Sequence, residues 1–432
     1  MKTKVKFKQT EIGMISEDWE VKGLEEVASY ITEKINIDEI NPKRFISTEN
    51  MISDKGGITI PSSLPKGKVT HFKEKDILFS NIRTYFKKLW LARFEGGCSN
   101  DVLVIRPKDS SLSDIFLYYY LSQDYFFEYT VLTSKGTKMP RGDKNAIMNF
   151  QINIPGLAEQ SAIAKILSDL DSKIELNQQM NKTLEAIGQA IFKHWFVNFE
   201  FPNEKGKPYK SSGGEMVDSE LGEIPKGWEV LNIDKLTEHI TTGLNPRDNF
   251  KLGRGYNNYI TIKNISENHD IVFDDSSDKV DDNAIKKIHF RAKLAKGDIL
   301  FSGVATIGRV YYIDKNPTKW GINESIFSFR ANENYLSTPI LYWLLISQNF
   351  QLYAQQLASG SVQRGIRMSD LRKYLFAVPK LSEQQFFSNT LGLIISKMKN
   401  NFQEISELIT LRDSLLPKLM SGKIRVPVEA RT

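Results

Sequence analysis

The chain has 432 residues, of which 41% are hydrophobic and 25% are charged, and its formal net charge is +6. This length suits two or three domains of roughly 100–200 residues each. A membrane-spanning helix is excluded because no run of about 18 apolar residues occurs, and the mild positive charge suits a nucleic acid partner without requiring one.

Two features of the sequence bear on the compartment. The basic N-terminus has no apolar stretch behind it, so we expect no signal peptide and a cytoplasmic protein. The single cysteine, Cys98, cannot form an internal disulfide, which fits a reducing compartment. We expect Cys98 to be a small buried hydrophobic residue rather than a nucleophile.

Residues 1–155 carry the signals of a compact α+β domain. Short β-type runs, such as DILFS at 76–80 and DVLVIRP at 101–107, alternate with Gly, Asn and Asp turn signals. An apolar and aromatic run over 115–132 indicates a helical piece within the domain. We therefore interpret 1–155 as the first globular domain of the chain.

A long helix is predicted over 156–200, directly after Pro155. Its apolar residues recur with alternating three- and four-residue spacing, which is typical of a heptad seam; they are Ile163, Leu167, Leu170, Ile174, Leu184 and Ile191. Asn177 also falls on a seam position. A polar residue there costs stability but fixes the register and the choice of partner.

The segment 201–220 is rich in Pro, Gly, Ser and charge, and it is predicted to be a linker. A second copy of the first plan follows it. ELGEIPKGWEV at 220–230 matches EIGMISEDWEV at 11–21 in six of eleven positions, and DILFS recurs unchanged at 298–302. Such a repeat indicates a duplication, so we expect a second α+β domain over 221–379.

A second long helix is predicted over 380–426. The motif P-x-L-x-E-Q precedes both helices, at 155–160 and at 379–384, and the heptad seam recurs after the second motif. The seam partners are Phe387, Leu391, Ile394, Met398, Leu408 and Leu415, and Asn401 matches Asn177. The offset between matched positions is larger here than at the Trp19–Trp228 pair, which indicates small loop insertions in the second copy.

The two helices are expected to form an antiparallel coiled coil with each other. A half-polar helix of roughly 35–40 residues, about 50–60 Å long, cannot bury its apolar stripe alone. The alternative is that each helix packs on its own domain or on another subunit. An antiparallel pair predicts two domains at opposite ends of a rod, related by a pseudo-two-fold axis. Such an arrangement suits two DNA half-sites that differ in sequence.

The motifs that carry chemistry are missing from the sequence. There is no G-x-x-x-x-G-K-[ST], no G-x-G-x-x-G, and no Asn- or Asp-Pro-Pro-aromatic motif of amino-methyltransferases. The five histidines are scattered, and the acidic run at 273–282 is interpreted as a solvated loop rather than a metal site. We expect no catalytic residue and no metal site on this chain.

Four segments together carry a resemblance to a known family: DSELGEIPKGWEV, P-x-L-x-E-Q followed by a long helix, IFKHWFVNFEFP at 191–202, and LLPKLMSGKIRV at 415–426. They resemble the specificity subunits of type I restriction-modification enzymes, and the similarity covers essentially the whole chain. The resemblance implies a non-catalytic subunit whose two target-recognition domains each read one half of a split, asymmetric DNA sequence.

The same resemblance implies partners for the helical regions. These regions would carry two copies of an adenine-methylating subunit, and the complex would recruit restriction subunits that act as motor and nuclease. S-adenosylmethionine, ATP and Mg²⁺ are therefore expected on the partner subunits, and no cofactor is expected on this chain.

Two loops in each domain are candidates for contact with double-stranded DNA. The first follows the DILFS strand, where small polar residues and arginines suit groove or phosphate contact; a purely structural turn is the alternative. The candidates in it are Ser80, Asn81, Arg83 and Tyr85 in the first copy and Ser302, Thr306 and Arg309 in the second.

The second loop occupies 134–144 and 359–367. Its lysines and arginines would neutralise phosphates, and glutamine and arginine can read base edges, although phosphate contact is the commoner kind. The candidates are Lys135, Thr137, Lys138, Arg141, Ser361, Gln363, Arg364 and Arg367. Thr48 and Lys263, in the matched segments RFISTEN and NYITIKN, are further candidates.

Two other interpretations stay open at this point. One is an enzyme, such as a stand-alone methyltransferase or nuclease, which would be active without partners. The other is a scaffold of two domains on a coiled coil that binds protein and not DNA. A salt-dependent shift of random duplex DNA would separate the scaffold from a DNA reader.

Overall fold

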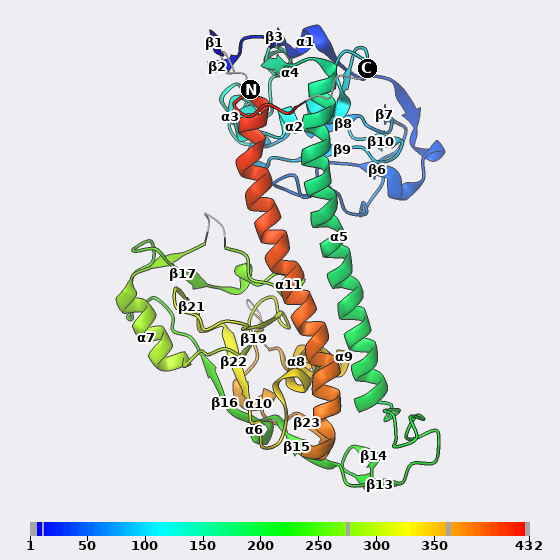
Figure 1. The fold of residues 1–432 in the computed structure, drawn as a ribbon, viewed down its shortest axis with the longest axis vertical. Coiled ribbons are helices and arrows are strands. Elements are labelled where there is room, and N and C mark those ends of the chain that lie inside the picture. The colour runs from blue at the N-terminus through cyan, green and yellow to red at the C-terminus, as the bar shows by residue number, and fades with distance from the viewer. Residues whose placement is uncertain (1–6, 11–12, 274–276, 360–363, 428–432) are drawn as a thin grey trace. The chain divides into compact units, whose positions relative to one another are not determined.

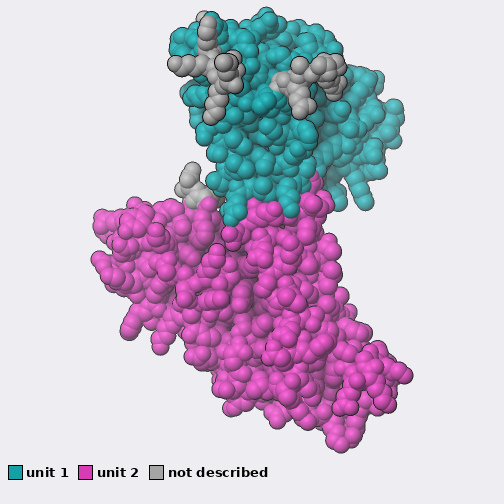
Figure 2. Space-filling model, viewed as in Figure 1, with its two compact units in different colours: residues 1–174, 406–432 teal, residues 175–405 magenta. Residues whose placement is uncertain are grey.

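The computed structural model describes residues 7–10, 13–273, 277–359 and 364–427. Contacts divide the chain into two compact units: unit 1 contains residues 1–174 and 406–432, and unit 2 contains residues 175–405 (Figure 2). Two long helices, α5 (Leu157–Phe196) and α11 (Leu381–Met420), each contribute residues to both units.

Unit 1 contains two four-stranded sheets (Figure 1). One is antiparallel with the order β4-β11-β8-β9, and the other has the order β5-β7-β10-β6, with β10 parallel to β6. The apolar run of β8 is buried along its whole length, as its sequence predicts. The strands are β1 Phe7–Thr10, β2 Gly13–Ser16, β3 Glu20–Gly23, β4 Ala28–Tyr30, β5 Lys34–Asn36, β6 Phe45–Ile46, β7 Lys68–Phe72, β8 Ile77–Ser80, β9 Leu89–Leu91, β10 Gly96–Cys98, β11 Val102–Pro107 and β12 Gln151–Ile154.

Short helices complete unit 1, and they pack their aromatic side chains on the antiparallel sheet. Phe126 and Phe127 contact Phe79 of β8, with ring centroids 5.5 and 6.2 Å away. These helices are α1 Leu24–Val27, α2 Asp114–Leu121, α3 Asp124–Leu132 and α4 Lys144–Met148. The helical piece predicted over 115–132 is thus two helices, α2 and α3. Ser122 caps the first, and the second starts at Asp124.

Unit 2 repeats this plan. Its four-stranded sheet has the order β16-β22-β19-β20, which matches β4-β11-β8-β9, and its pair β15-β23 matches β3-β12. The strands are β13 Met216–Ser219, β14 Gly222–Pro225, β15 Glu229–Asn232, β16 Thr237–Thr242, β17 Asn257–Ile260, β18 Lys279–Val280, β19 Ile299–Ser302, β20 Val310–Tyr312, β21 Trp320–Ile322, β22 Ile326–Ala331 and β23 Leu375–Val378. The predicted α+β duplication is therefore confirmed.

The helices of unit 2 include one element without a counterpart in unit 1. This is α7 (Asp282–Ala292), which follows β18. It accounts for part of the larger offset that the sequence shows in the second copy. The other helices are α6 Ile233–Leu236, α8 Thr338–Ile346, α9 Gln348–Leu357 and α10 Met368–Leu371.

The two long helices pack against each other within each unit and run antiparallel. In unit 1, Ile163 and Leu167 of α5 share a core with Leu419 of α11. In unit 2, Phe192 of α5 shares a core with Leu391 of α11. Every predicted seam residue is buried or half-buried, so the coiled-coil prediction is confirmed. No helix in the described part of the chain is long and apolar enough to cross a membrane.

A polar layer interrupts the apolar seam, as predicted. Asn177 and Asn401 are both 1% exposed. Asn401 donates to Asn181 Oδ1 over 2.8 Å, and Asn177 donates to Glu404 Oε2 over 2.9 Å. The layer thus contains two more polar residues than the sequence indicated. Because each amide has a partner, a shift of one helix along the other would leave buried polar groups unpaired.

The P-x-L-x-E-Q motif anchors each domain to the start of its long helix. The Trp19 indole donates to Glu159 over 3.2 Å, and the Trp228 indole donates to Glu383 over the same distance. We call this contact between tryptophan and helix start the joint of each unit. The glutamine that follows the glutamate completes it, because Gln160 donates to the carbonyls of Pro155 and Ser111. Gln384 does the same in unit 2 with Pro379 and Tyr335. The repeated tryptophan and the repeated motif are therefore two halves of one contact.

The aspartate of the K-x-D-I-L-F-S motif has a structural role in both units. Asp76 is 2% exposed and receives two hydrogen bonds from Arg106, at 2.5 and 2.7 Å. Asp298 is fully buried and receives two from Arg330, at 2.7 and 2.9 Å. A forked arginine–carboxylate contact of this kind fixes the strand that leads into the candidate DNA loop.

The segment 201–220 is more structured than its composition indicated. Phe201 is buried and stacks on Trp228, with ring centroids 5.1 Å apart and planes inclined by 16°. Its last part forms β13, which pairs with β14. The aromatic stack explains why the chain packs here in spite of many Gly, Ser and Pro residues.

Cys98 lies on β10 and is buried. Its thiol donates weakly to the Val102 carbonyl over 3.7 Å. Burial raises the pKa of the thiol to about 12, so it is not ionised at neutral pH. This confirms the prediction of a small buried hydrophobic residue.

Candidate nucleic-acid interface

The two candidate loops of each domain, far apart in the sequence, lie side by side in the structure. In unit 1, Ile82 of the first loop pairs with Arg141 of the second in an isolated bridge, and Arg83 N donates to Pro140 O over 2.9 Å. In unit 2, Val304 pairs with Gly365 in the same way. In each unit, the two candidate loops therefore form one paired surface.

The second loop is also closed on itself in both units. Lys135 and Arg141 exchange two backbone hydrogen bonds, of 2.8 and 2.9 Å. Ser359 and Gly365 exchange the equivalent pair, of 3.1 and 2.9 Å. In unit 1, where the residues between this pair are described, the closure holds the second loop as a hairpin, so its side chains project from a defined base.

Most of the unit 1 candidates lie on the exposed side of this surface. Arg83, Tyr85, Lys135, Thr137, Lys138 and Arg141 are all exposed. Two of the cations also contact carboxylates, because Lys135 pairs with Asp143, and Arg141 pairs with Asp101 over 3.1 Å. Since the two cationic side chains are exposed, these ion pairs cost little to exchange for contact with a phosphate.

Three candidates are corrected by the structure. Ser80, Asn81 and Ser302 are 2%, 6% and 0% exposed. The Ser302 hydroxyl donates to Thr306 O over 2.6 Å and accepts from Arg309 N. These side chains shape the loop from inside and do not reach a ligand on its surface.

Arg309 also differs from its predicted role. Its guanidinium donates to the carbonyls of Ile265 over 2.7 Å and Ile262 over 3.3 Å, and only 22% of the side chain is exposed. Arg309 therefore holds the neighbouring turn in place. A long cationic side chain can serve either purpose, and the sequence does not separate them.

The remaining unit 2 candidates have mixed positions. Thr306 and Arg367 are exposed. Arg364 is exposed and donates to the carbonyls of Gln355 and Ala358, 3.2 and 3.3 Å away. Ser361 and Gln363 lie outside the described residues.

The two weaker candidates lie in the matched turns after β6 and β17. Thr48 is half-buried, and its carbonyl accepts a hydrogen bond from Lys88 over 2.6 Å. Lys263 is exposed and pairs with Asp278 over 3.4 Å. In unit 1, the Lys88 bond ties this turn to the end of the first candidate loop.

Sequence reasoning missed the turn 53–55, which supports the first loop of unit 1. Asp54 N donates to Phe86 O and Lys55 N to Lys87 O, each over 2.9 Å. The candidate loop itself contains Phe86 and Lys87, in the letters YFKK, so the sequence offers both residues. The turn itself lies well before the loop in the chain, ahead of β7, and its letters SDKGG indicate a turn but not the loop that it supports.

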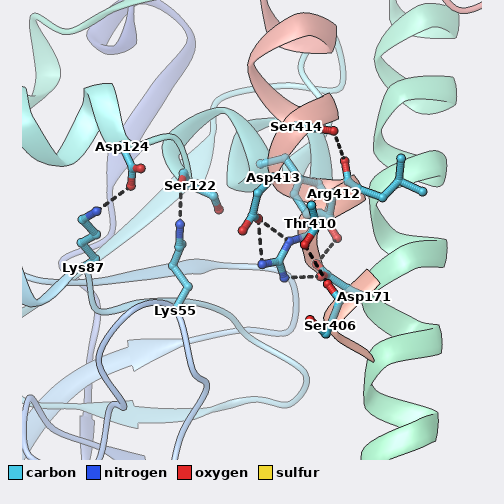
Figure 3. A network of polar contacts seen from close by, with 12 residues as sticks. Lys55, Lys87, Ser122, Asp124, Asp171, Ser406, Thr410, Arg412, Asp413 and Ser414 are labelled. Carbon is cyan, nitrogen blue, oxygen red and sulfur yellow. Dashed lines mark hydrogen bonds and ion pairs between the residues drawn. The ribbon is translucent and has the colours of Figure 1, made fainter. Parts of the chain in front are cut away.

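Figure 3 shows the polar contacts behind this loop. Lys87 pairs with Asp124 over 2.7 Å, and this hydrogen bond raises the pKa of the lysine. Lys55 donates to the Ser122 carbonyl over 3.1 Å, and burial lowers its pKa. In the same view, Arg412 of α11 pairs with Asp171 of α5 over 2.8 Å. Because Asp124 begins α3 and Ser122 ends α2, the two lysine contacts anchor the loop and its supporting turn on the junction of α2 and α3.

The described residues contain no group of three His, Cys, Asp or Glu side chains that could hold a metal ion. The acidic run at 273–282 is described only in part, because 274–276 lie outside the described residues. The exposed groups at the paired loops include cations, hydroxyls and aromatic rings. This set suits a polyanion with stacked bases.

Known DNA specificity proteins are similar to this chain over almost its whole length. The family model described as the type I restriction modification DNA specificity domain matches residues 16–186 and 225–408. The type I restriction enzyme MjaIX specificity subunit of Methanocaldococcus jannaschii is 26% identical, over 97% of this chain and 96% of that protein. The HindI specificity subunit of Haemophilus influenzae is 26% identical, over 94% of this chain and 100% of that protein.

A solved structure of a related system has the same fold. The crystal structure of the S subunit of a type I restriction-modification system from M. genitalium aligns with a TM-score of 0.54 and 15% sequence identity. The alignment covers 97% of this chain and 99% of the other. Both copies of the repeat are included in these matches.

Proposed function

The chain belongs to the type I restriction-modification DNA specificity family, as a non-catalytic specificity subunit, and on that premise we propose that its two units read two different halves of one DNA target. The observation that carries this proposal is the paired loop surface, which is built once in each unit from segments far apart in the sequence. The exposed side chains on the two surfaces differ, so the two half-sites should differ as well.

The strands that lead into the loops support the assignment of one half-site to each unit. Each loop follows a strand that is fixed by a buried aspartate–arginine contact, at Asp76 and at Asp298. Groups that read DNA must be held in position before binding, because an ordered loop loses less entropy when the complex forms. The strands and helices that the two units share would then hold the loops in position, and the loop residues that differ would determine which bases each unit reads.

We further propose that α5 and α11 set the spacing between the half-sites. Each helix is continuous over 40 residues, which corresponds to about 60 Å. The asparagine layer fixes the register of the pair. A fixed register would give a fixed number of unread base pairs between the two halves of the target.

The partners follow from the family as proposals. Two methylation subunits would dock on the helical regions, and restriction subunits would join the complex. S-adenosylmethionine, ATP and Mg²⁺ would be bound by those subunits, in the cytoplasm, and not by this chain. The domain limits proposed are 1–155 and 221–379 for recognition and 156–200 and 380–426 for the helical regions, with 201–220 between them.

The experiment that tests the proposal compares DNA binding by the purified complex of this chain with its methylation subunits. Random duplex DNA should shift in a salt-dependent way, and one bipartite sequence should compete far more strongly than the rest. A complex that assembles but does not bind DNA would favour the scaffold interpretation. Methylation or cleavage by the chain alone would favour the enzyme interpretation.

A further inference from the structure

The first loop of unit 1 carries two exposed aromatic side chains next to each other. Tyr85 is 49% exposed and Phe86 is 38% exposed, and their ring centroids are 4.7 Å apart. Both belong to a single 3-10 turn, Thr84–Phe86. Large aromatic surface in water is unfavourable, so this pair gains most from a partner that covers it.

The backbone that presents the pair is held in an uncommon conformation. Four non-glycine residues in two adjacent turns have left-handed φ angles: Asp54 at 54°, Lys55 at 60°, Arg83 at 52° and Lys87 at 51°. Such residues are rare, and they cluster where a function requires a fixed geometry. The cluster surrounds Tyr85 and Phe86 on both sides.

The two turns brace each other and the second loop. The bonds from Asp54 and Lys55 to the carbonyls of Phe86 and Lys87 join the turns, and Arg83 N joins the first loop to Pro140. Lys87 is tied further to Asp124. The aromatic pair therefore stands on a base that resists being pushed aside when a ligand presses on it.

Unit 2 builds the same loop without the aromatic pair. Ala305 has a φ of 59° and corresponds to Arg83, and Gly308 at 96° corresponds to Lys87. Only Thr306 and Ile307 lie between them, one residue fewer than in unit 1. Ile307 is half-buried and packs against the core. The two units therefore differ in shape at this point.

The charge around the pair favours DNA over protein as the partner. Arg83, Lys138 and Arg141 are exposed on the paired loops, and the Lys88 ammonium lies 5.7 Å from the centroid of the Phe86 ring. Cations contact phosphates while an apolar side chain enters the stack of bases; this combination is how proteins unstack and kink a duplex.

We propose that Tyr85 and Phe86 form a wedge that enters the base stack in the half-site read by unit 1, and that unit 2 binds its half-site without a wedge. The proposal rests on the proposed function, because it assumes that this surface faces DNA. It adds a mode of reading: the first half-site would be selected partly for a base step that unstacks easily.

The test uses the complex with its methylation subunits and its own target duplex. The fluorescent bases 2-aminopurine and pyrrolocytosine replace adenine and cytosine at each position in turn, and fluorescence reports unstacking. We expect a severalfold rise at one step in the first half-site. The double variant Tyr85→Ala, Phe86→Ala should lose this rise and bind the target roughly 10-fold more weakly, whereas Tyr85→Phe should keep it.

Two controls make the outcome decisive. Ile307→Ala changes the matched position of unit 2 and should leave the fluorescence rise in the first half-site unchanged. An adenine extruded for methylation should give its own signal in both half-sites, and that signal should survive in the double variant. Specific binding without a wedge signal, or a signal that persists in the double variant, would overturn the wedge alone. Failure of specific binding by the wild-type complex would instead overturn the proposed function.

Discussion

The joints of the two units are nearly identical, while their reading surfaces are not. In each unit a tryptophan bonds to the glutamate at the start of a long helix over 3.2 Å, and the next glutamine closes the joint. The first candidate loop, in contrast, carries Tyr85 and Phe86 in unit 1 and only Ile307 in unit 2. The two copies therefore share the contacts that hold each domain on its long helix, and they differ in the loops that those domains present.

The joints themselves differ in one respect, which is how the chain after each helix covers the tryptophan. In unit 2, Phe201 stacks on Trp228. In unit 1, at the matched position, Arg425 lies 6.0 Å from the Trp19 ring and bonds to Glu159 at 2.6 and 2.8 Å and to Asp18 at 2.8 Å. One unit thus closes its joint with an aromatic stack and the other with an ion network.

The largest effect is expected from a change to the part that both units share. One heptad inserted between residues 174 and 175 of α5, and one between 405 and 406 of α11, adds about 10.5 Å to each helix. At about 3.4 Å per base pair, the spacer of the target should lengthen by roughly three base pairs. Selection of bound sequences from a random library reports the spacer.

The original target should then be bound no better than random DNA, a loss of about 4–10 kcal/mol in binding free energy. A heptad inserted into α5 alone is the control, and it should disrupt the seam and assembly instead. An unchanged spacer in the double insertion would show that the helices do not set the distance.

The next largest effect should separate the two joints. Phe201→Ala removes a buried ring and should lower the free energy of unfolding by about 3–5 kcal/mol. Urea denaturation monitored by tryptophan fluorescence measures this. Val197→Ala, an exposed position shortly before the stack, should change stability by less than about 0.5 kcal/mol. Equal effects of the two substitutions would contradict the role of the stack.

An intermediate effect concerns the reading surface of unit 2. Replacing Gln363 and Arg364 by alanine should weaken binding at the second half-site by about 1–3 kcal/mol and leave the first half-site intact. Arg141→Ala, in the second loop of unit 1, is the reciprocal variant, and it should weaken binding at the first half-site and leave the second intact. Competition with duplexes mutated in one half at a time measures the difference. Equal loss at both halves would contradict the assignment of one unit to each half.

The smallest effect is a pH dependence confined to the ion network of unit 1. The hydrogen bond from Arg425 lowers the pKa of Asp18 below its usual range. The unfolded pKa of an aspartate is about 3.9. A carboxyl whose folded pKa is lower than this adds stability at a pH above about 3.9, and that stability disappears as the pH falls through the folded pKa.

Asp18 is largely exposed, so Asp18→Asn should cost no more than about 1 kcal/mol at pH 7. The difference in melting temperature between the variant and the wild type should shrink as the pH falls below about 4. A difference that is constant with pH would contradict an ionic origin.

Much of this plan could be predicted from the sequence, because repetition and periodicity are local signals. The heptad spacing from Ile163 to Ile191 predicted the helix, and the matched Asn401 predicted the polar layer. The partners Asn181 and Glu404 could not be predicted, since they depend on how two helices far apart in the chain are aligned.

The candidate surface was predicted less completely, for reasons that lie in side-chain direction. The sequence did not indicate that the two candidate loops of each unit lie side by side, and Ser80 and Ser302 point inward while Arg309 holds a turn. A serine at the end of a strand has the same letter whether it faces the core or the solvent. The turn 53–55, which supports the first loop of unit 1, belongs to a separate segment of the chain, so only the fold shows that the two are in contact.

The central claim is that each unit reads one half of a bipartite target, and methylation mapping of the host genome tests it most directly. Genomes from cells with this gene, without it, and with Arg141→Ala in unit 1 should be compared. The account predicts one methylated motif of two blocks with a fixed spacer, which disappears without the gene and relaxes in one block only in the variant. A continuous motif, or methylation unchanged by loss of the gene, would contradict it.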